Sequence, residues 1–177
     1  MAATVGAALR RHGIKAVLTG GACASLYTRG AYESVDMDFV LTGSTTQARL
    51  DAALASIGFV RAGDRHVHDR VRFYVEFPRG PLAIGADYRV TPVERRTPHG
   101  RLLMLSATDS CCDRLAAFYH WNDRQSLQVA VTIARRARVN VKKLRAWSAA
   151  EGAAEKFIEF SRELERARRP RARPKGP

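Results

Sequence analysis

Two carboxylates separated by a single residue, Asp36 and Asp38, are the side chains in this sequence best suited to chemistry. They lie in an alternating run, VDMDFVL at 35–41, which predicts a β-strand. Residues two apart on a strand share a face, so both carboxylates point one way while Met37 and Phe39 point into the core. Like charges held this close repel each other, and a hard divalent cation such as Mg²⁺ relieves the repulsion. The pair predicts a metal site.

Two glycines upstream, Gly20 and Gly21, supply the complementary group. They follow an apolar run at 14–19 that predicts a buried strand, and they precede a small-residue stretch at 22–28 that predicts a helix. Glycine has no Cβ atom, so a ligand can approach its backbone closely, and free N–H groups at a helix N-terminus favour phosphate. Phosphates and metal would then meet at one edge of the sheet, as phosphoryl or nucleotidyl transfer requires.

The rest of the chain must position these groups, and its patterning changes near residue 106. The first part predicts helices at 4–12 and 45–57, strands at 59–61, 71–77 and 82–84, and a hairpin around His99-Gly100 that leads into 101–105. The second part predicts helices at 109–121, 124–138, 141–150 and 153–168. We expect an α+β fold with three parts: a short mixed β-sheet core with flanking helices in residues 1–106, a C-terminal helical subdomain in 107–168 that forms the other wall of a cleft, and a basic flexible tail in 169–177.

Composition limits the class of protein. The 177 residues are 46% hydrophobic and 27% charged, as in a soluble globular domain. The 30 Lys and Arg residues against 17 Asp and Glu give a net charge of +13, which favours nucleic acid, nucleotides or an acidic partner. The three cysteines form no C-x-x-C pair, and no stretch looks like a signal peptide or a membrane span. We therefore expect a cytoplasmic protein with no membrane partner.

Two segments, 18–22 (LTGGA) and 34–39 (SVDMDF), resemble the signature of the DNA-polymerase-β-like nucleotidyltransferase superfamily. That signature is Gly-Gly or Gly-Ser after the first strand, followed by Asp-x-Asp on the second. The likeness is closest to AbiEii-type toxins of toxin–antitoxin systems, which pair a catalytic α/β domain with C-terminal helices. The resemblance implies that Asp36 and Asp38 are catalytic and hold Mg²⁺ or Mn²⁺. It also implies a nucleoside triphosphate (NTP) substrate.

The resemblance further implies a third catalytic, metal-binding carboxylate on a later strand. Glu76 is the best match and Asp87 the reserve candidate. Gly20, Gly21 and Ser34 would bind the nucleotide.

A second, helical motif at 113–118 and 120–125 is also similar to that group. It places Arg114 and Asp123 at the nucleotide. Cys112 stands near the expected position of a lysine, which leaves neutralisation of the triphosphate to Arg114 or Arg124.

These inferences predict Mg²⁺-dependent nucleotidyl transfer from an NTP to a polar acceptor. The charge favours RNA, the toxin resemblance makes tRNA the leading candidate, and a cognate antitoxin would be a further partner. A protein hydroxyl or a small molecule such as an aminoglycoside stays open. The alternative is a catalytically weak or inactive protein that keeps the fold and binds nucleotide or RNA. Two histidines that share a strand face, His66 and His68, are interpreted as a solvated pair rather than a metal site.

Overall fold

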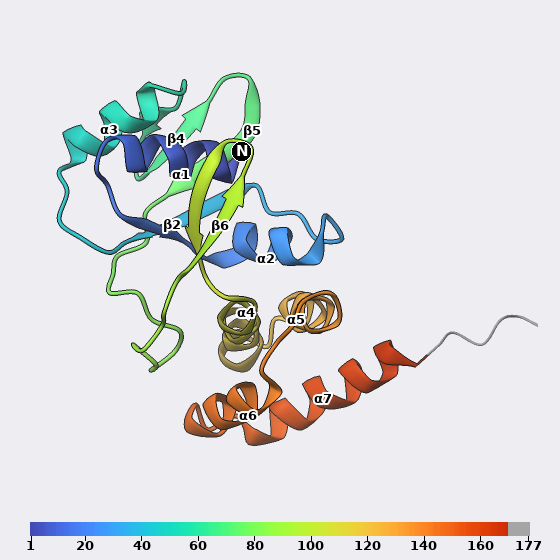
Figure 1. Ribbon diagram of the computed structural model, residues 1–177. Helices are drawn as coiled ribbons and strands as arrows, with labels where there is room; N and C mark the ends of the chain where they lie inside the picture. The colour runs from blue at the N-terminus through green and yellow to red at the C-terminus, as the bar shows by residue number, and fades with distance from the viewer. Residues whose placement is uncertain (170–177) are drawn as a thin grey trace, which may run out of the picture.

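The structure is a computed structural model, and it describes residues 1–169. Its strands are β1 (Ala16–Leu18), β2 (Asp36–Leu41), β3 (Val60–Ala62), β4 (Arg65–His68), β5 (Val71–Glu76), β6 (Val93–Thr97) and β7 (Gly100–Met104). Its helices are α1 (Ala2–Arg11), α2 (Gly20–Thr28), α3 (Gln47–Ala55), α4 (Ala107–Trp121), α5 (Arg124–Arg136), α6 (Val141–Ala150) and α7 (Ala154–Arg168). Figure 1 shows their arrangement. The predicted tail lies outside the described residues from 170 onward.

The seven strands form one mixed sheet in the order β3-β4-β5-β2-β1-β7-β6. At its centre β1 runs antiparallel to β2, and β2 runs parallel to β5. The hairpin predicted around residues 99–100 is present, with Thr97 opposite Gly100. This mixed sheet with its helices confirms the α+β expectation.

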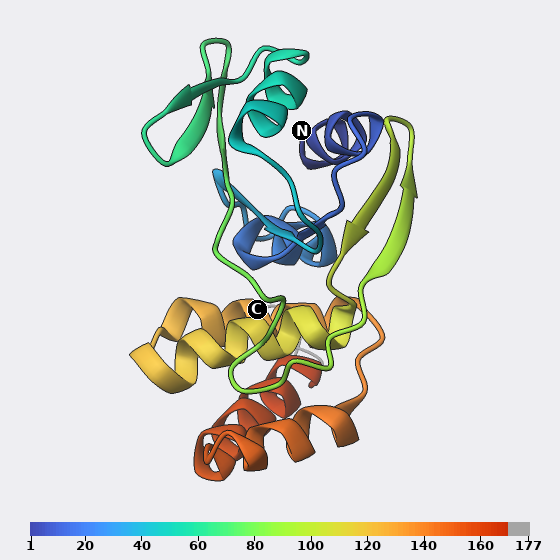
Figure 2. The same ribbon diagram turned by 90° about the vertical axis from the view of Figure 1, so that its left-hand side faces the viewer.

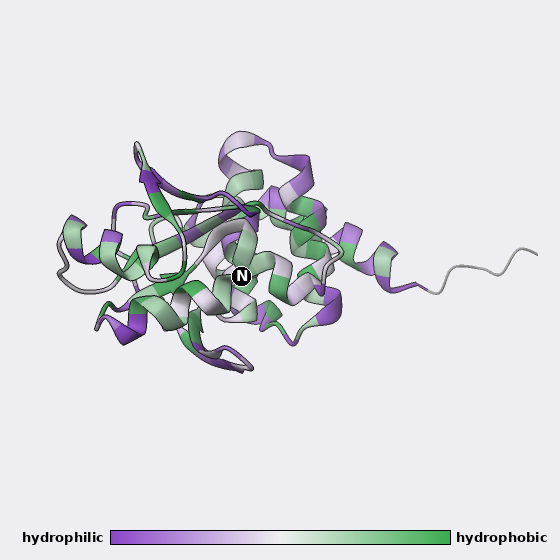
Figure 3. Ribbon diagram, turned by 90° about the horizontal axis from the view of Figure 1, so that it is seen from above, coloured by the Kyte–Doolittle hydropathy of each residue, from purple (hydrophilic) through white to green (hydrophobic). Residues whose placement is uncertain are grey.

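The core consists of the inner strand faces and the helix faces packed on them. Apolar side chains of the central strands are fully buried, among them Leu18, Phe39 and Val75. Figure 3 shows hydrophobic segments in the interior of the molecule and hydrophilic segments at its outer turns and helix ends. α2 packs on β2 on one side and on α4 and α5 on the other, so it joins the sheet to the helical part. No helix in residues 1–169 is both long and apolar enough to cross a membrane.

Three of the four helices in residues 107–168 begin at side-chain caps that the sequence supplies. Ser106, Asp123 and Asn140 accept hydrogen bonds from backbone N–H groups in the first turns of α4, α5 and α6. Such caps satisfy N–H groups that have no partner within the helix. The boundaries of the helical half therefore follow from polar residues that can be seen in the sequence.

The segment that joins β5 to β6 does not form the strand predicted at 82–84. Only Ile84 and Asp87 make an isolated bridge. The segment instead crosses to the helical half, as Figure 2 shows, where Trp147 donates its indole N–H to the carbonyl of Ile84 at 3.2 Å. The carboxylate of Glu151, whose side chain is 7% exposed, accepts the Ala86 N–H at 2.7 Å. Nearby Pro78 and Pro81 have no N–H to donate to a strand ladder, which explains why the segment follows α6 rather than the sheet.

Replacing Glu151 with alanine should destabilise the fold by about 1–3 kcal/mol, because the hydrogen bond from the Ala86 N–H to a charged and largely buried carboxylate is lost. Urea unfolding measures this change, and hydrogen exchange at Ala86 should accelerate. The matched control is Glu165→Ala, which removes an exposed carboxylate and should change stability by less than about 0.5 kcal/mol. Equal stability of the two variants would show that Glu151 does not hold the segment.

Candidate active site

The carboxylates predicted from the sequence lie on one face of the sheet. In the parallel pairing of β2 and β5, Asp36 is opposite Tyr74 and Asp38 is opposite Glu76. Between them Met37 lies opposite Val75, and both of these are buried on the other face. Because paired residues on neighbouring strands share a face, three carboxylates and one phenol point to the same side. Their chemical roles stay predictions.

Gly20 lies directly against the carboxylate of Asp38. A Cβ atom built on Gly20 would collide with Asp38 Oδ2, and the residue has a φ of +62°, which side chains disfavour. The backbone of Thr19 donates to the carbonyl of Asp38 at 2.9 Å. Gly20 and Gly21 form the first turn of α2, so the helix starts two residues earlier than the sequence predicted. Only glycine allows the helix N-terminus to approach the carboxylate this closely.

Two residues of the loop between α2 and β2 cover Gly21. A Cβ atom at Gly21 would lie 2.8 Å from Ser34 Cβ and 3.0 Å from the Tyr32 hydroxyl. Ser34 also donates a hydrogen bond to Asp36 Oδ1. Ser34 therefore connects the glycine turn to the first carboxylate, and its contact with a nucleotide stays a prediction.

The local field works against ionisation of Asp38. Burial raises its pKa to about 6, and the negative charges of Asp36, Glu76 and Asp113 add to the rise, while Arg114 opposes it. The repulsion between these carboxylates therefore destabilises the folded protein. A bound cation would relieve that repulsion.

The donor atoms fit a hard cation that arrives with phosphates. No three His, Cys, Asp or Glu side chains within residues 1–169 form a ready-made metal cage. Mg²⁺ seldom uses such a cage, because it keeps several waters and binds one or two carboxylates together with substrate phosphate oxygens. The all-oxygen pair Asp36 and Asp38 beside a glycine turn matches that pattern.

The wall formed by α4 brings further charges near the carboxylates. Arg114 forms an ion pair of 2.7 Å with Asp113, and both side chains are mostly buried. One acidic partner thus already neutralises much of the charge of Arg114, and contact of Arg114 with a nucleotide stays a prediction. Cys112 is buried. No lysine stands at Cys112, but Lys143 from α6 lies near it. Lys143 donates to Asp109 at 2.7 Å, and its positive charge acts on the Cys112 thiol.

Three other acidic or basic candidates have structural partners. Asp123 caps α5 through Ser126, whose N–H donates at 3.0 Å and whose hydroxyl donates at 2.7 Å. The reserve candidate Asp87 lies off the sheet and accepts from Arg89 at 2.9 Å. Arg124 pairs with Glu159 at 2.6 Å. The structure assigns capping to Asp123, and contact of Asp123 with a nucleotide stays a prediction.

Sequence reasoning missed two side chains on the carboxylate face. Tyr74 could have been found, because it lies two residues before Glu76 on the same strand. Arg65 could not, because only the register shows that it lies opposite Glu76, with its guanidinium 4.9 Å from the centre of the Tyr74 ring.

The histidine interpretation was wrong for His66. Its side chain is 2% exposed and bonds Asp51 at 2.8 Å. The register shifts between His66 and His68, so the two do not form a solvated pair.

No protein-family model and no curated protein matches the chain. Solved structures do match it. An antigenic nucleotidyltransferase-like protein from Paracoccidioides brasiliensis superposes with a TM-score of 0.65 at 14% identity, over 93% of this chain and 90% of that one. ANT(2″)-Ia in complex with adenylyl-2″-tobramycin gives 0.55 at 14% identity, over 85% and 94%. The solution structure of the antibiotic-resistance factor ANT(2″)-Ia gives 0.51 at 14%, over 90% and 94%. The chain therefore has the fold of nucleotidyltransferase-like proteins.

Proposed function

We propose that this protein transfers a nucleotidyl group from an NTP to a polar acceptor, with Mg²⁺ or Mn²⁺ as cofactor. One observation carries the proposal: the N-terminal glycine turn of α2 packs against Asp38, on the sheet face that also presents Asp36 and Glu76. A helix N-terminus favours phosphate, and paired carboxylates favour a divalent cation. The two halves of a metal–triphosphate complex would thus bind side by side.

Each residue would then have a separate task. Asp36 and Asp38 would hold the cation, and the backbone of Gly20 and Gly21 would bind phosphate oxygens, with Ser34 orienting Asp36. The cation would neutralise charge on the phosphates. The acceptor oxygen forms a bond to the α-phosphorus, the bond from that phosphorus to the bridging oxygen breaks, and pyrophosphate leaves. Glu76 would bind a second cation and take the proton that the acceptor hydroxyl loses.

RNA is the acceptor that the charge favours, and tRNA is the leading candidate. A net charge of +13 attracts a polyanion and repels cations. The proposal extends to a cytoplasmic toxin with a cognate antitoxin, on the sequence resemblance alone.

A small-molecule acceptor is the second candidate, because two of the similar structures are of ANT(2″)-Ia, one of them with adenylyl-2″-tobramycin. The positive charge of this chain disfavours a cationic aminoglycoside. A weak or inactive nucleotide-binding protein is the third candidate, since Arg114 and Lys143 are both paired with acids.

Transfer of a radiolabelled α-phosphate tests the proposal. The chain should label RNA in the presence of Mg²⁺, and the labelled product should disappear with EDTA and in Asp36→Ala. Label on tobramycin but not on RNA would select the second candidate. Retention of nucleotide without any covalent product would select the third.

A further inference from the structure

A groove lined by four arginines lies at the end of α2 remote from the carboxylates. Arg29 comes from the end of α2, Arg95 and Arg96 from β6, and Arg136 from the end of α5. The hollow measures about 540 Å³, which is within the usual size of a ligand site. We call it the arginine groove. None of its arginines was part of the nucleotide site predicted from the sequence.

Two of these arginines are held in place by the carbonyl end of α2. Arg136 donates to the carbonyl of Thr28, and Arg95 donates to the carbonyl of Leu26 at 3.5 Å. A guanidinium has five N–H donors, so each of the two keeps most of its donors for another partner. Because an anchored arginine loses less freedom on binding, the pair is suited to hold an anion.

The four arginines of the groove are not neutralised by ion pairs in the described part of the chain. Within residues 1–169, none of its four arginines forms an ion pair, in contrast to Arg114, Arg124 and Lys143. Among the same residues, Glu94 is the one acidic residue that lines the groove, and its carboxylate pairs with Arg101, which is outside the groove, at 3.4 Å. An unneutralised cluster of this kind destabilises the free chain through repulsion, and a bound anion removes that repulsion.

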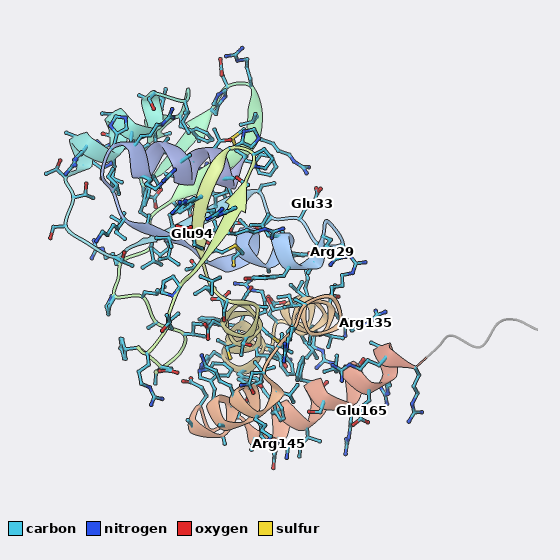
Figure 4. All side chains as sticks on the ribbon, in the orientation of Figure 1. Arg29, Glu33, Glu94, Arg135, Arg145 and Glu165 are labelled. Carbon is cyan, nitrogen blue, oxygen red and sulfur yellow. The ribbon has the colours of Figure 1, made fainter. Side chains whose placement is uncertain are left out.

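A second basic hollow lies next to the groove. It measures about 790 Å³ and is lined by Arg135, Arg166, Arg168 and Arg169 together with Glu163. Consecutive residues, Arg135 and Arg136, point one into each hollow. Arg29 and Arg135 lie on the same side of the molecule in Figure 4, at the ends of α2 and α5. Two adjacent positive hollows suit an anion with repeated charges better than a single nucleotide.

We infer that the arginine groove binds the phosphate backbone of an RNA strand. The inference rests on the proposed transfer function for its choice of RNA over other polyanions. α2 connects the two sites, because its first turn lies at Asp38 and its last residue lies in the groove region. A nine-residue helix is about 13 Å long, so a strand of a few nucleotides could span this distance. The groove would hold the RNA while one end reaches the carboxylates.

The test is RNA binding to the full chain without nucleotide or Mg²⁺, measured by the anisotropy of a fluorescent single-stranded oligoribonucleotide over a range of salt. The variant is Arg29→Asn with Arg96→Gln. Neither side chain anchors α2, and asparagine tolerates the left-handed backbone at Arg29, which has a φ of 52°. Loss of two phosphate contacts should weaken binding roughly tenfold and make the salt slope shallower by about 1.4, at about 0.7 per contact.

The matched control is Lys15→Gln with Arg70→Gln, which removes two exposed charges elsewhere on the protein. It should stay within about twofold of the wild type, because it removes no phosphate contact. An equal loss in the two double variants would overturn the inference, as would the absence of RNA binding by the wild-type chain. Equal binding of oligoglutamate, lost in the same groove variant, would assign the groove to an acidic protein segment instead.

The binding assay is independent of the transfer reaction. If the groove variant loses RNA while the wild type transfers no nucleotide, the proposed function fails and the arginine groove stands. The opposite result is also distinguishable. If the wild type transfers nucleotide to RNA but the groove variant binds RNA as tightly as the wild type, the RNA-binding role of the groove is wrong and the proposed function stands. Thermal unfolding of both double variants verifies that they fold.

Discussion

Replacing Asp38 with asparagine should lower the rate of nucleotidyl transfer by about 10³-fold or more while making the metal-free protein more stable. The loss follows because an amide cannot supply the negative charge that the cation needs. The gain follows because Asp38 is held among Asp36, Glu76 and Asp113, whose charges, together with burial, raise its pKa to about 6. A residue that is costly to the fold and necessary for the reaction is typical of an active site.

The gain in stability should depend on pH. The folded pKa of about 6 lies above the usual unfolded value of about 3.9, so the folded chain binds the proton more tightly. The wild type in EDTA should therefore lose stability as pH rises from about 4 to 6, and should level off above that. Because Asp38 is partly open to solvent, we expect a loss of about 1–2 kcal/mol. Asp38→Asn should lack this step.

Urea unfolding at pH 4 and pH 8 in EDTA measures the stability, and the labelled-phosphate assay measures transfer. Asp64→Asn is the matched control, because it makes the same chemical change at an exposed turn residue. It should alter neither property. Full activity of Asp38→Asn would remove the carboxylate from the mechanism.

The sequence predicted β2 and the glycine turn of α2 because the strand period, the turn residues and the helix start all agree there. The alternation of Asp36, Met37, Asp38 and Phe39 fixes which face of β2 is buried, and the structure buries Met37 and Phe39. The residue types indicated a glycine turn at the start of α2, and the structure gives it a geometric cause, the contact of Gly20 with Asp38. A short-range pattern suffices where strand period, turn chemistry and helix start all point the same way.

Long-range partners account for what the sequence could not show. The segment at 82–84 has the apolar composition of a strand, yet Trp147 and Glu151, more than sixty residues later, hold it against α6. The sequence predicted a solvated His66, but this side chain is buried against Asp51, which comes from α3. The arginine groove combines residues from three distant elements. Such groupings depend on tertiary register, which no local window contains.

Replacing Gly20 with alanine should destabilise the protein by about 2–4 kcal/mol and reduce transfer by about 10²-fold. Two costs add at this position. The left-handed backbone, with a φ of +62°, disfavours any Cβ atom, and the new methyl would collide with the carboxylate of Asp38. Asp38 must then move away from the phosphate turn, and a displacement of about 1 Å at a reacting site is enough to lower a rate by that factor. Urea unfolding and the transfer assay measure the two effects.

Gly63→Ala separates the two costs of the Gly20 substitution. Gly63 has nearly the same backbone, with a φ of +69°, but a Cβ atom there meets nothing within 4 Å. Gly63→Ala should therefore lower the free energy of unfolding only through left-handed backbone strain, by about 1–2 kcal/mol, and should keep full transfer activity. The difference between the two alanine variants isolates the contact between Gly20 and Asp38. If both variants lost the same stability and both kept full activity, the closeness of the glycine turn to Asp38 would have no part in the reaction, and the phosphate site would have to be sought elsewhere on the carboxylate face.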